Sequence, residues 1–445
     1  MVTEFRSDEL LRMVDHERGI VDRRIFYDAD IYQLELEHIF ARAWNFVAHD
    51  SQIPNPGDFF MTFIGEDRVI VVRDNDMQPQ VMINSCRHRG NAVCRAEEGH
   101  ATSFMCTYHG WTYDLKGALV GVPGFKEVYH EELDRENWGL IKARTETYGG
   151  FIFANMDPEA PDLDEYLGEV GRLSIDYVNV RGKVIVAPGI QKWIIPSNWK
   201  FAVDNVWDYY HAPLTHSSAL LGGWQNRTGI PEPRPVPPRS YKAEHLVVLG
   251  DYGHAMSGPI VPQAVMEPGL NMMLDNTWRQ TEEIKRAVGT VGQRFYGHPH
   301  IFPNLWLMPN VMQASLRLPR GPMSTEIWWF SYYYEEMSPT ERYETLRRCV
   351  RHNGPAGMFE VDDGENWGES THGTRAISTR QAPLNYAMGL GHSEVIHNET
   401  DPPHVEALAN EHGQLWHYRN WAEWMAADSW DDLKRIHTPP PDDRI

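Results

Sequence analysis

The stretch D204-N-V-W-D-Y-Y-H-A-P-L-T-H216 decides how the rest of this chain is interpreted. It offers two histidines, His211 and His216, with Asp208 three residues before the first. On a helix, positions three apart share a face, so the Asp208 carboxylate can reach the His211 ring. The five-residue step to His216 would point the two rings apart on a straight helix. Because Pro213 lies between them, we expect the helix to bend or end there and to bring both rings to one point.

A carboxylate behind a histidine is a common way to orient a metal ligand, so the stretch predicts a metal site. The alternative is that both histidines are ordinary polar residues, since the chain contains 21 of them. The stretch alone leaves both interpretations open.

Composition indicates a globular protein with more than one domain. Its 445 residues are 42% hydrophobic and 23% charged, and no apolar run approaches the length that crosses a bilayer. The polar first ten residues are not expected to form a signal peptide. A net charge of −21 argues against nucleic acid or an anionic membrane as a partner. Four cysteines are too few for a disulfide scaffold of this size, so we expect a cytoplasmic protein.

The pattern of apolar and polar residues changes along the chain. An amphipathic helix is expected at 30–42, with Asp30 as its N-cap and Gln33 completing a capping box. From about residue 53 to 156 short strands and turns predict a small all-β domain, followed by an acidic linker at 157–165. Strands are expected in this domain at 59–64, 68–73, 81–84, 103–106, 112–114 and 148–155. Beyond it the pattern predicts strands at 184–188, 192–196, 304–309, 311–318 and 325–334, helices at 341–353 and 404–427, and a proline-rich loop section at 222–239.

Two short motifs in the β domain, C86-R-H88 and C106-T-Y-H109, each place a cysteine and a histidine on a loop after a predicted strand. Zinc sites also use two Cys and two His, but they usually space the first pair by two to four residues and keep the histidines together. A Rieske [2Fe–2S] centre needs two cysteines on one iron and two histidines on the other. Two similar loops, each with one cysteine and one histidine, would supply these four ligands. We therefore predict Cys86, His88, Cys106 and His109 as cluster ligands.

A carboxylate would complete His211 and His216 as a 2-His-1-carboxylate site, the arrangement of O₂-activating non-heme Fe(II) proteins. The run G354-P-A-G-M-F-E-V-D-D-G-E-N-W367 supplies acids interleaved with apolar residues, which favours a half-buried element. Acid runs are usually solvated, which is the competing interpretation. The residues alone do not choose between Asp362 and Asp363.

Together these motifs resemble the catalytic α subunits of Rieske non-heme iron aromatic-ring-hydroxylating dioxygenases, over nearly the whole chain. The resemblance is carried by the two Cys–His motifs, by N198-W-K…D204-N-x-x-D208-x-Y-H211-x4-H216, and by F359-E-x-D-D363-G-E-N-W367. It implies that His211, His216 and Asp363 bind a mononuclear iron. It also implies that Asp208 links His211 to a cluster histidine, His109, of a neighbouring subunit. Phe359 stands where some relatives carry Trp, a departure that bears on pocket shape.

The implied fold is α+β, with an all-β Rieske domain inserted in a catalytic domain of antiparallel sheet and helices. We expect an N-terminal helical part of the catalytic domain at 1–43, the Rieske domain at 44–157 and the catalytic domain with mononuclear iron at 158–445. The implied assembly is α3β3, with the small β subunit on a separate chain. No G-x-G-x-x-G follows a predicted strand, so we expect no dinucleotide site in this chain. The resemblance implies that electrons come from NADH only through a partner reductase, usually with a ferredoxin.

The implied activity is that of a terminal oxygenase, which uses O₂ and two electrons to cis-dihydroxylate an aromatic ring. Alternatives on the same iron are a Rieske monooxygenase and a dioxygenase of an aromatic carboxylate such as benzoate or phthalate. A Rieske electron carrier is the alternative from another class, and it would need only the β domain.

Apolar residues beside the predicted ligands favour a neutral mono- or polycyclic aromatic hydrocarbon as the substrate. A buried arginine that anchors a carboxylate would instead favour an aromatic acid, and Arg227 and Arg317 are candidates for that role. The predicted pocket residues are Asn205, Val206, Phe302, Leu307, Met358 and Phe359.

Overall fold

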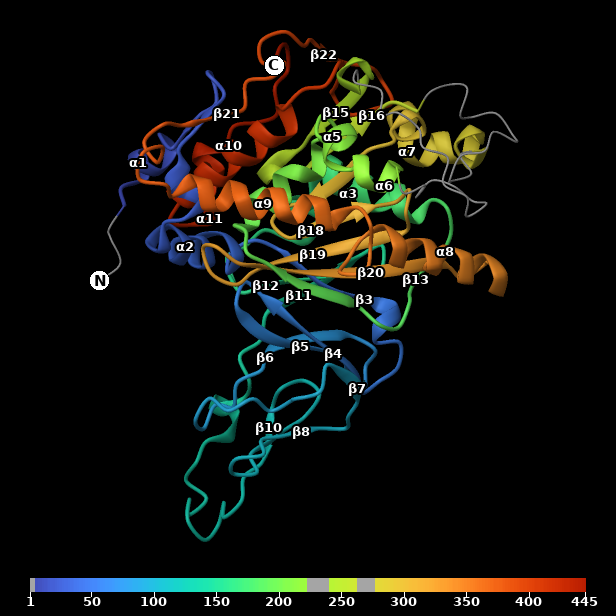
Figure 1. The fold of residues 1–445 in the computed structure, drawn as a ribbon. Coiled ribbons are helices and arrows are strands. Elements are labelled where there is room, and N and C mark those ends of the chain that lie inside the picture. The colour runs from blue at the N-terminus through green and yellow to red at the C-terminus, as the bar shows by residue number, and fades with distance from the viewer. Residues whose placement is uncertain (1–4, 222–239, 262–276) are drawn as a thin grey trace. The chain divides into compact units, whose positions relative to one another are not determined.

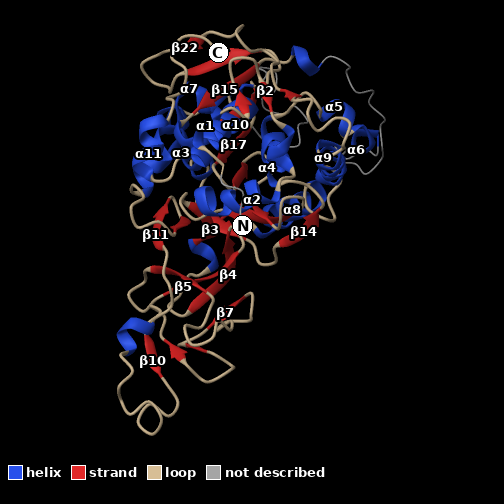
Figure 2. Ribbon diagram, turned by 90° about the vertical axis from the view of Figure 1, so that its left-hand side faces the viewer, coloured by secondary structure: helices blue, strands red, loops and turns tan. Residues whose placement is uncertain are grey.

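The computed structural model describes residues 5–221, 240–261 and 277–445, and Figure 1 shows the fold. Residues 1–39 and 164–445 form one compact unit, and residues 40–163 form a second, smaller one. In Figure 2 the helices concentrate in the larger unit, whereas the smaller unit is almost entirely strands and loops. The predicted α+β class, with an all-β domain inserted in a mixed one, is confirmed. The predicted proline-rich loop at 222–239, which includes Arg227, lies outside the described residues.

Three antiparallel sheets build the smaller unit. A four-stranded sheet has the order β6 (Pro79–Ile83), β5 (Asp67–Arg73), β4 (Asp58–Ile64), β7 (Glu98–His100). A second has the order β10 (Leu119–Gly121), β9 (Thr112–Tyr113), β8 (Phe104–Met105), and a third the order β11 (Arg144–Tyr148), β12 (Phe151–Asn155), β3 (Asn45–His49). The strands predicted on either side of residues 65–67 are confirmed. The single strand predicted at 148–155 is correct only in part: residues 151–155 form β12, but Gly149 and Gly150 adopt φ of 56° and 87° and turn the chain between β11 and β12.

One large antiparallel sheet forms the centre of the larger unit. Its order is β13 (Val184–Val186), β20 (Thr325–Tyr334), β19 (Gln313–Pro319), β18 (Leu305–Met308), β17 (His298–Ile301), β16 (Ala255–Pro259), β15 (His245–Leu249), β23 (His404–Ala407), β22 (Val395–Ile396), and β14 (Gln191–Ile195) also pairs with β20. Every residue of β18 and β19 is buried, so both faces of the sheet are covered there. A separate three-stranded sheet, whose strands do not pair with the large sheet, consists of β1 (Val14–Asp15), β2 (Ile20–Val21) and β21 (Leu384–Asn385). The five strands predicted beyond the β domain are confirmed.

The helices of the larger unit pack around this sheet. They include α1 (Ser7–Leu11), α2 (Ala29–Glu35), α3 (Leu163–Asn179), α4 (Trp199–Asp204), α7 (Glu282–Arg294), α8 (Pro339–His352), α9 (Glu360–Thr374), α10 (His412–Ala426) and α11 (Trp430–Ile436). In Figure 1, α8 and α9 run along the same side of β18–β20. Nearly every residue of α10 is buried, because this helix packs against α4 as well as β15 and β16. The helix predicted at 404–427 is therefore correct only in part, since its first residues form β23.

Glu35 joins three segments that are far apart in the sequence. Its carboxylate is fully buried and accepts hydrogen bonds of 2.8 Å from the indole nitrogens of Trp199 and Trp421. It also pairs with the buried ammonium of Lys200. Burial lowers the pKa of Lys200, and Glu35 opposes that effect. Glu35 thereby ties α2, which precedes residues 40–163 in the sequence, to α4 and α10, which follow them.

The start of α2 differs from the prediction. Asp28, not Asp30, is the N-cap, because the Asp28 side chain accepts hydrogen bonds from the backbone nitrogens of Asp30 and Ile31. The Gln33 side chain donates to Glu37 one turn later, so the predicted capping box is wrong.

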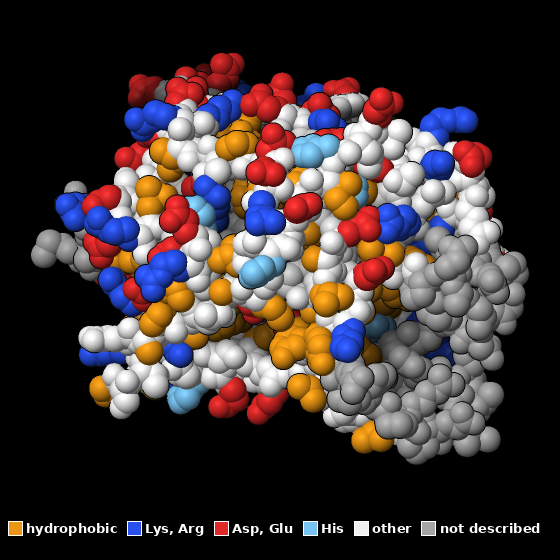
Figure 3. Space-filling view, turned by 90° about the horizontal axis from the view of Figure 1, so that it is seen from above, with side chains coloured by type: hydrophobic (Ala, Val, Ile, Leu, Met, Phe, Trp, Pro, Cys, Tyr) orange, Lys and Arg blue, Asp and Glu red, His pale blue; other side chains and the backbone are white. Residues whose placement is uncertain are grey.

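No helix among the described residues is long and apolar enough to span a membrane. On the face drawn in Figure 3, acidic and basic side chains are interspersed. The net charge of −21 is therefore not gathered into a single acidic patch on the described residues of that face.

Candidate functional site

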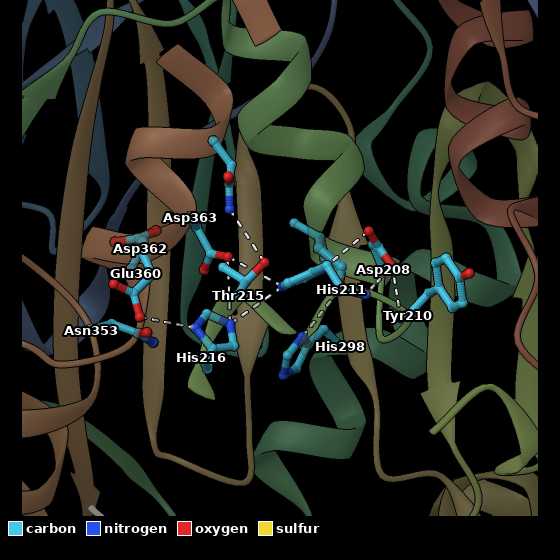
Figure 4. Close-up of polar contacts among 12 residues, drawn as sticks. Asp208, Tyr210, His211, Thr215, His216, His298, Asn353, Glu360, Asp362 and Asp363 are labelled. Atoms are coloured by element: carbon cyan, nitrogen blue, oxygen red, sulfur yellow. Dashed lines mark hydrogen bonds and ion pairs between the residues drawn. The ribbon is translucent and has the colours of Figure 1, made fainter. Parts of the chain in front are cut away.

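Three side chains from two distant segments converge in the larger unit. His211 and His216 come from the stretch quoted first, and Asp363 comes from the first turn of α9 (Figure 4). Nε2 of His211 lies 3.3 Å from Nε2 of His216 and 3.2 Å from Oδ1 of Asp363. Nε2 of His216 lies 3.5 Å from the same oxygen. Ligand atoms about 2 Å from a first-row divalent ion stand about 3 Å from one another, so this group fits such an ion.

The backbone of the stretch is broken before Pro213. A short 3₁₀ turn, η5 (Asn205–Trp207), continues α4, and Asp208 then takes an extended conformation with φ −84° and ψ 99°. A new helix, α5 (Ala212–Thr215), starts with Pro213 in its first turn and is followed by α6 (Ser217–Leu221). The predicted break exists, but its placement at Pro213 is wrong, because proline fits the first turn of a helix.

Asp208 organises this break with both of its carboxylate oxygens. Oδ1 accepts hydrogen bonds from the backbone nitrogens of Tyr210 (2.7 Å) and His211 (3.2 Å). Oδ2 lies 3.1 Å from Nδ1 of His211. One side chain therefore turns the backbone and orients the ring, which leaves Nε2 of His211 directed toward His216 and Asp363 (Figure 4).

The electrostatics of the group favour a positive charge at its centre. Burial lowers the pKa of His211, but pairing with Asp208 and Asp363 outweighs burial and raises that pKa to about 10. Burial lowers the pKa of His216. Burial raises the pKa of Asp208, yet pairing with His211 brings it below its usual value. One carboxylate, that of Asp363, thus faces two imidazoles, and the second, that of Asp208, lies behind His211. Two imidazoles and one carboxylate form a donor set that suits a divalent cation.

The structure distinguishes the two acids that the sequence leaves open. Asp363 is nearly buried and places Oδ1 beside both Nε2 atoms. Asp362 points elsewhere: its Oδ2 accepts a 2.9 Å hydrogen bond from Ser218 and lies 3.9 Å from Nδ1 of His216. Asp363 is the acid that the fold brings to the two histidines.

The six predicted pocket residues occupy different environments. The Phe359 ring stacks on the His216 ring with 4.3 Å between centroids, so it borders the group. Phe302 packs against Trp199 and Trp424. Of the others, Val206 and Leu307 are buried, Asn205 is half-buried and Met358 is 36% exposed. The pocket assignment stays a prediction.

His298 is a neighbour of the site that the sequence analysis missed. It lies on β17, its Nδ1 is 3.0 Å from the carbonyl oxygen of Val206, and Figure 4 shows its ring beside His211. Burial lowers its pKa to about 3, so this ring is neutral. The alternation G297-H-P-H300 could have indicated it, because residues two apart on a strand share a face.

The two Cys–His loops of the smaller unit have the same backbone hydrogen bonds. Gly90 N donates to Cys86 O at 2.8 Å, and Gly110 N donates to Cys106 O at 2.9 Å. Cys86 N and Cys106 N likewise each donate at 2.8 Å to the carbonyl five residues later. Both glycines adopt positive φ, 75° and 76°, which turns each loop. The similarity of the two loops inferred from the sequence is therefore present in the backbone.

The side chains of these loops present soft and nitrogen ligands together. The His88 and His109 rings lie 4.5 Å apart between centroids, and Nδ1 of His88 is buried without a hydrogen-bond partner in the described chain. Cys86 and Cys106 are buried, and Cys86 Sγ lies 3.3 Å from the Tyr113 hydroxyl. Burial raises the pKa of the Cys106 thiol, but donors that include the Tyr108 backbone outweigh burial and lower it. A thiolate is the form that binds iron, so the residues fit a [2Fe–2S] cluster.

Comparison with known proteins identifies both units. Residues 163–427 match the catalytic domain of the ring hydroxylating alpha subunit, and residues 43–133 match the Rieske [2Fe–2S] domain. Biphenyl dioxygenase subunit alpha of Paraburkholderia xenovorans is 35% identical over 97% of this chain and 96% of its own length. Biphenyl 2,3-dioxygenase subunit alpha of Rhodococcus jostii is 37% identical over 96% of this chain and 93% of its own.

Solved structures give the same result. A naphthalene 1,2-dioxygenase mutant bound to phenanthrene superposes with a TM-score of 0.85 at 28% identity, covering 97% of both chains. Naphthalene 1,2-dioxygenase from Rhodococcus sp. bound to indole gives 0.79 at 32% identity, over 92% of this chain and 95% of that one. The Rieske match removes the zinc alternative, and the catalytic-domain match disfavours a simple electron carrier. The chain belongs to the family of ring-hydroxylating dioxygenase alpha subunits, oxidoreductases that combine a Rieske [2Fe–2S] domain with a non-heme iron catalytic domain.

Proposed function

We propose that His211, His216 and Asp363 hold iron(II) and that the chain is the large subunit of a dioxygenase for a neutral aromatic hydrocarbon. The observation that carries this proposal is the convergence of these three ligand atoms within 4.8 Å, with Asp208 behind His211. Cys86, His88, Cys106 and His109 hold the [2Fe–2S] cluster in the same proposal.

When bound, the cluster supplies electron transfer and the iron supplies O₂ activation for addition of both oxygen atoms to adjacent ring carbons. The chain's own residues set the conditions for that chemistry. Asp208 fixes the His211 ring through Nδ1. Phe359 covers one face of the His216 ring and excludes water from that side.

The preference for a neutral substrate rests on Arg317 and on the relatives. Arg317 is fully buried and pairs with Glu360 at 3.1 Å, so its charge is already engaged inside the protein. Relatives that align over almost the whole chain are named for biphenyl, benzene and naphthalene. We therefore place a neutral mono- or polycyclic arene ahead of an aromatic acid as the substrate.

The assembly and electron supply complete the proposal. The large subunit pairs with a small β subunit as α3β3, and electrons come from NADH in the cytoplasm through a reductase and usually a ferredoxin. Asp208 then serves as the bridge between His211 and His109 of a neighbouring copy. Its half-buried carboxylate, already fixed by the Tyr210 and His211 backbone, supports that role.

Iron analysis combined with a substrate panel tests the proposal. The wild-type chain should hold three irons, two in the cluster and one at the mononuclear site. Asp363→Ala should hold two and keep the Rieske spectrum, and Asp362→Ala, the matched control, should hold three. The purified complex, with surrogate electron-transfer proteins, should oxidise naphthalene, biphenyl or phenanthrene. Turnover of benzoate or phthalate alone would overturn the substrate assignment, and two irons in the wild type would overturn the iron site.

A further inference from the structure

Arg317, on β19, is a guanidinium buried among aromatic rings. It is 0% exposed and lies 4.5 Å, 5.3 Å and 5.7 Å from the ring centroids of Trp306, Trp367 and Trp329. None of its three side-chain nitrogens makes a hydrogen bond to the residues that the structure describes. Ring faces attract a cation, but they do not replace the hydrogen bonds that it makes in water. The one carboxylate at ion-pair distance in the described chain is Glu360, with Oε1 3.1 Å from Nη2.

Glu360 is held from two directions. Besides the contact to Arg317, Oε2 accepts a hydrogen bond from Nε1 of Trp329 on the neighbouring strand β20. Glu360 is 1% exposed, so these partners and not solvent determine where its carboxylate lies.

Glu360 is also the first residue of the helix that carries Asp363. The N-cap residue of α9, Phe359, makes no side-chain capping hydrogen bond, so the usual means of fixing a helix start is missing here. Residues three apart on a helix share a face and stand about 4.5 Å apart along the axis. A carboxylate clamped at Glu360 therefore determines how far the first turn is rotated and, with it, where Asp363 points.

We propose that the buried Arg317–Glu360 pair is a positioning device that aims Asp363 at His211 and His216. The inference rests on the proposed function, which assigns these three residues to iron. Stability does not account for the pair, because a buried ion pair can often be replaced by apolar groups of similar volume without loss. The pair joins β19, in which every residue is buried, to the turn that presents Asp363, which is where rigidity improves a metal site.

The test separates fold stability from metal binding. The double variant Arg317→Met/Glu360→Gln removes both charges and keeps the approximate volumes, and Gln can still accept the Trp329 indole hydrogen bond. We expect its melting temperature to stay near the wild-type value. Anaerobic titration of iron-depleted protein with Fe(II) should show binding at the mononuclear site weakened about 10- to 100-fold. The Rieske absorbance of the same sample measures folded protein.

A matched control lies beside the same strands. Arg320, directly after β19, pairs with Glu326 of β20 at 2.8 Å, and Glu326 accepts a 2.9 Å hydrogen bond from Trp328. The residue types are the same, but no residue of α9 takes part. Arg320→Met/Glu326→Gln should bind Fe(II) like the wild type. Glu360→Asp, which keeps the charge and shortens the side chain, should fold and still weaken iron binding.

Each outcome assigns the failure to one proposal. Wild-type-like Fe(II) binding by the Arg317/Glu360 double variant or by Glu360→Asp overturns the positioning role. Equal weakening in the Arg320/Glu326 control overturns it as well, because the effect would then be general. Failure of the wild type to take up a third iron overturns the proposed function itself.

Discussion

The two groups of proposed ligands in this chain are built in opposite ways. Each Cys–His loop is short, repeats the backbone hydrogen bonds of the other and lies in a small β unit. The group of His211, His216 and Asp363 is assembled from two distant segments, and it depends on Asp208 for one ring and on the start of α9 for the acid. Local spacing therefore makes the first site readable from sequence, whereas the second depends on the tertiary fold.

The largest expected effect comes from Asp208, the residue proposed to connect the two kinds of site. Asp208→Asn keeps the size but removes the charge and one acceptor oxygen. We expect both metal centres to remain, with some loss at the mononuclear site, and product formation to fall about a hundredfold or more because electrons stop at the cluster. The measurement is single turnover of pre-reduced, iron-loaded protein with substrate and O₂, following cluster reoxidation and product together.

The control for this variant is Asp362→Asn. Asp362 is also an acid near the site, but its carboxylate accepts a hydrogen bond from Ser218 and is not paired with Nε2 of either histidine. Its variant should turn over normally. Near-normal reoxidation and product yield in Asp208→Asn would show that Asp208 is only a local capping residue.

The next prediction concerns the order in which the two sites fail. The group of His211, His216 and Asp363, built from distant segments, should lose its metal before the two short Cys–His loops do. Lys200→Met leaves the Glu35 carboxylate buried without its counter-charge, which should cost about 3–5 kcal/mol of unfolding free energy. In a denaturant titration, mononuclear iron should be lost before the Rieske absorbance. Lys434→Met, which breaks an exposed pair with Glu165, should shift the unfolding free energy by less than about 1 kcal/mol. Loss of the mononuclear iron and of the Rieske absorbance at the same denaturant concentration would contradict the expected order.

A smaller effect should divide the two similar loops. Gly90 and Gly110 share a positive φ, so alanine at either position costs about 1–2 kcal/mol of backbone strain. A Cβ at Gly110 would also lie 2.8 Å from Cγ of Pro123, whereas at Gly90 its nearest neighbour is Oγ of Ser85 at 3.8 Å. Gly110→Ala should therefore lose its cluster at lower denaturant concentration than Gly90→Ala. Equal denaturation midpoints for the two variants, measured by Rieske absorbance, would show that Pro123 moves away from the added Cβ at no cost in stability.

The smallest effect is a pH dependence confined to the larger unit. Burial lowers the pKa of His437, but pairing with Asp251 and Glu423 outweighs it and raises the pKa to about 9 from 6.5. The raised pKa means that this stabilisation is complete below pH 6.5 and is lost as pH rises through about 9. His437→Gln should flatten the unfolding free energy of the larger unit over that range and leave cluster loss unchanged. If the unfolding free energies of His437→Gln and the wild type change in parallel with pH, the pairing of His437 with Asp251 and Glu423 does not stabilise the larger unit.

The features of this fold that the sequence predicts best are those with a local signal. The Cys–His loops and the strands on either side of residues 65–67 were predicted, since spacing and turn residues act over short distances. The α2 N-cap was placed two residues late, because two acids in the same short segment could both cap. The helix break was assigned to Pro213, whereas the carboxylate of Asp208 turns the backbone earlier.

The choice between Asp362 and Asp363 could not be made from local sequence for a different reason. It depends on the rotation of α9, and the two residues that hold Glu360 at its start, Arg317 and Trp329, come from β19 and β20. Periodicity also cannot separate a buried core residue from a pocket residue. Phe302 and Val206 are both apolar and buried, yet Phe302 packs among Trp199 and Trp424 while the Val206 backbone lies beside His298.

The buried position of Glu35 has a consequence for the order in which the chain is made. Its partners Lys200 and Trp421 follow it by 165 and 386 residues. At the usual translation rate of about 5–20 residues per second, Trp421 is synthesised roughly 20–80 s after Glu35. Residues 40–163, which form a compact unit of their own, are synthesised within that interval. The N-terminal segment must meanwhile keep an acid, and the apolar residues around it, available on the nascent chain until the last helices emerge.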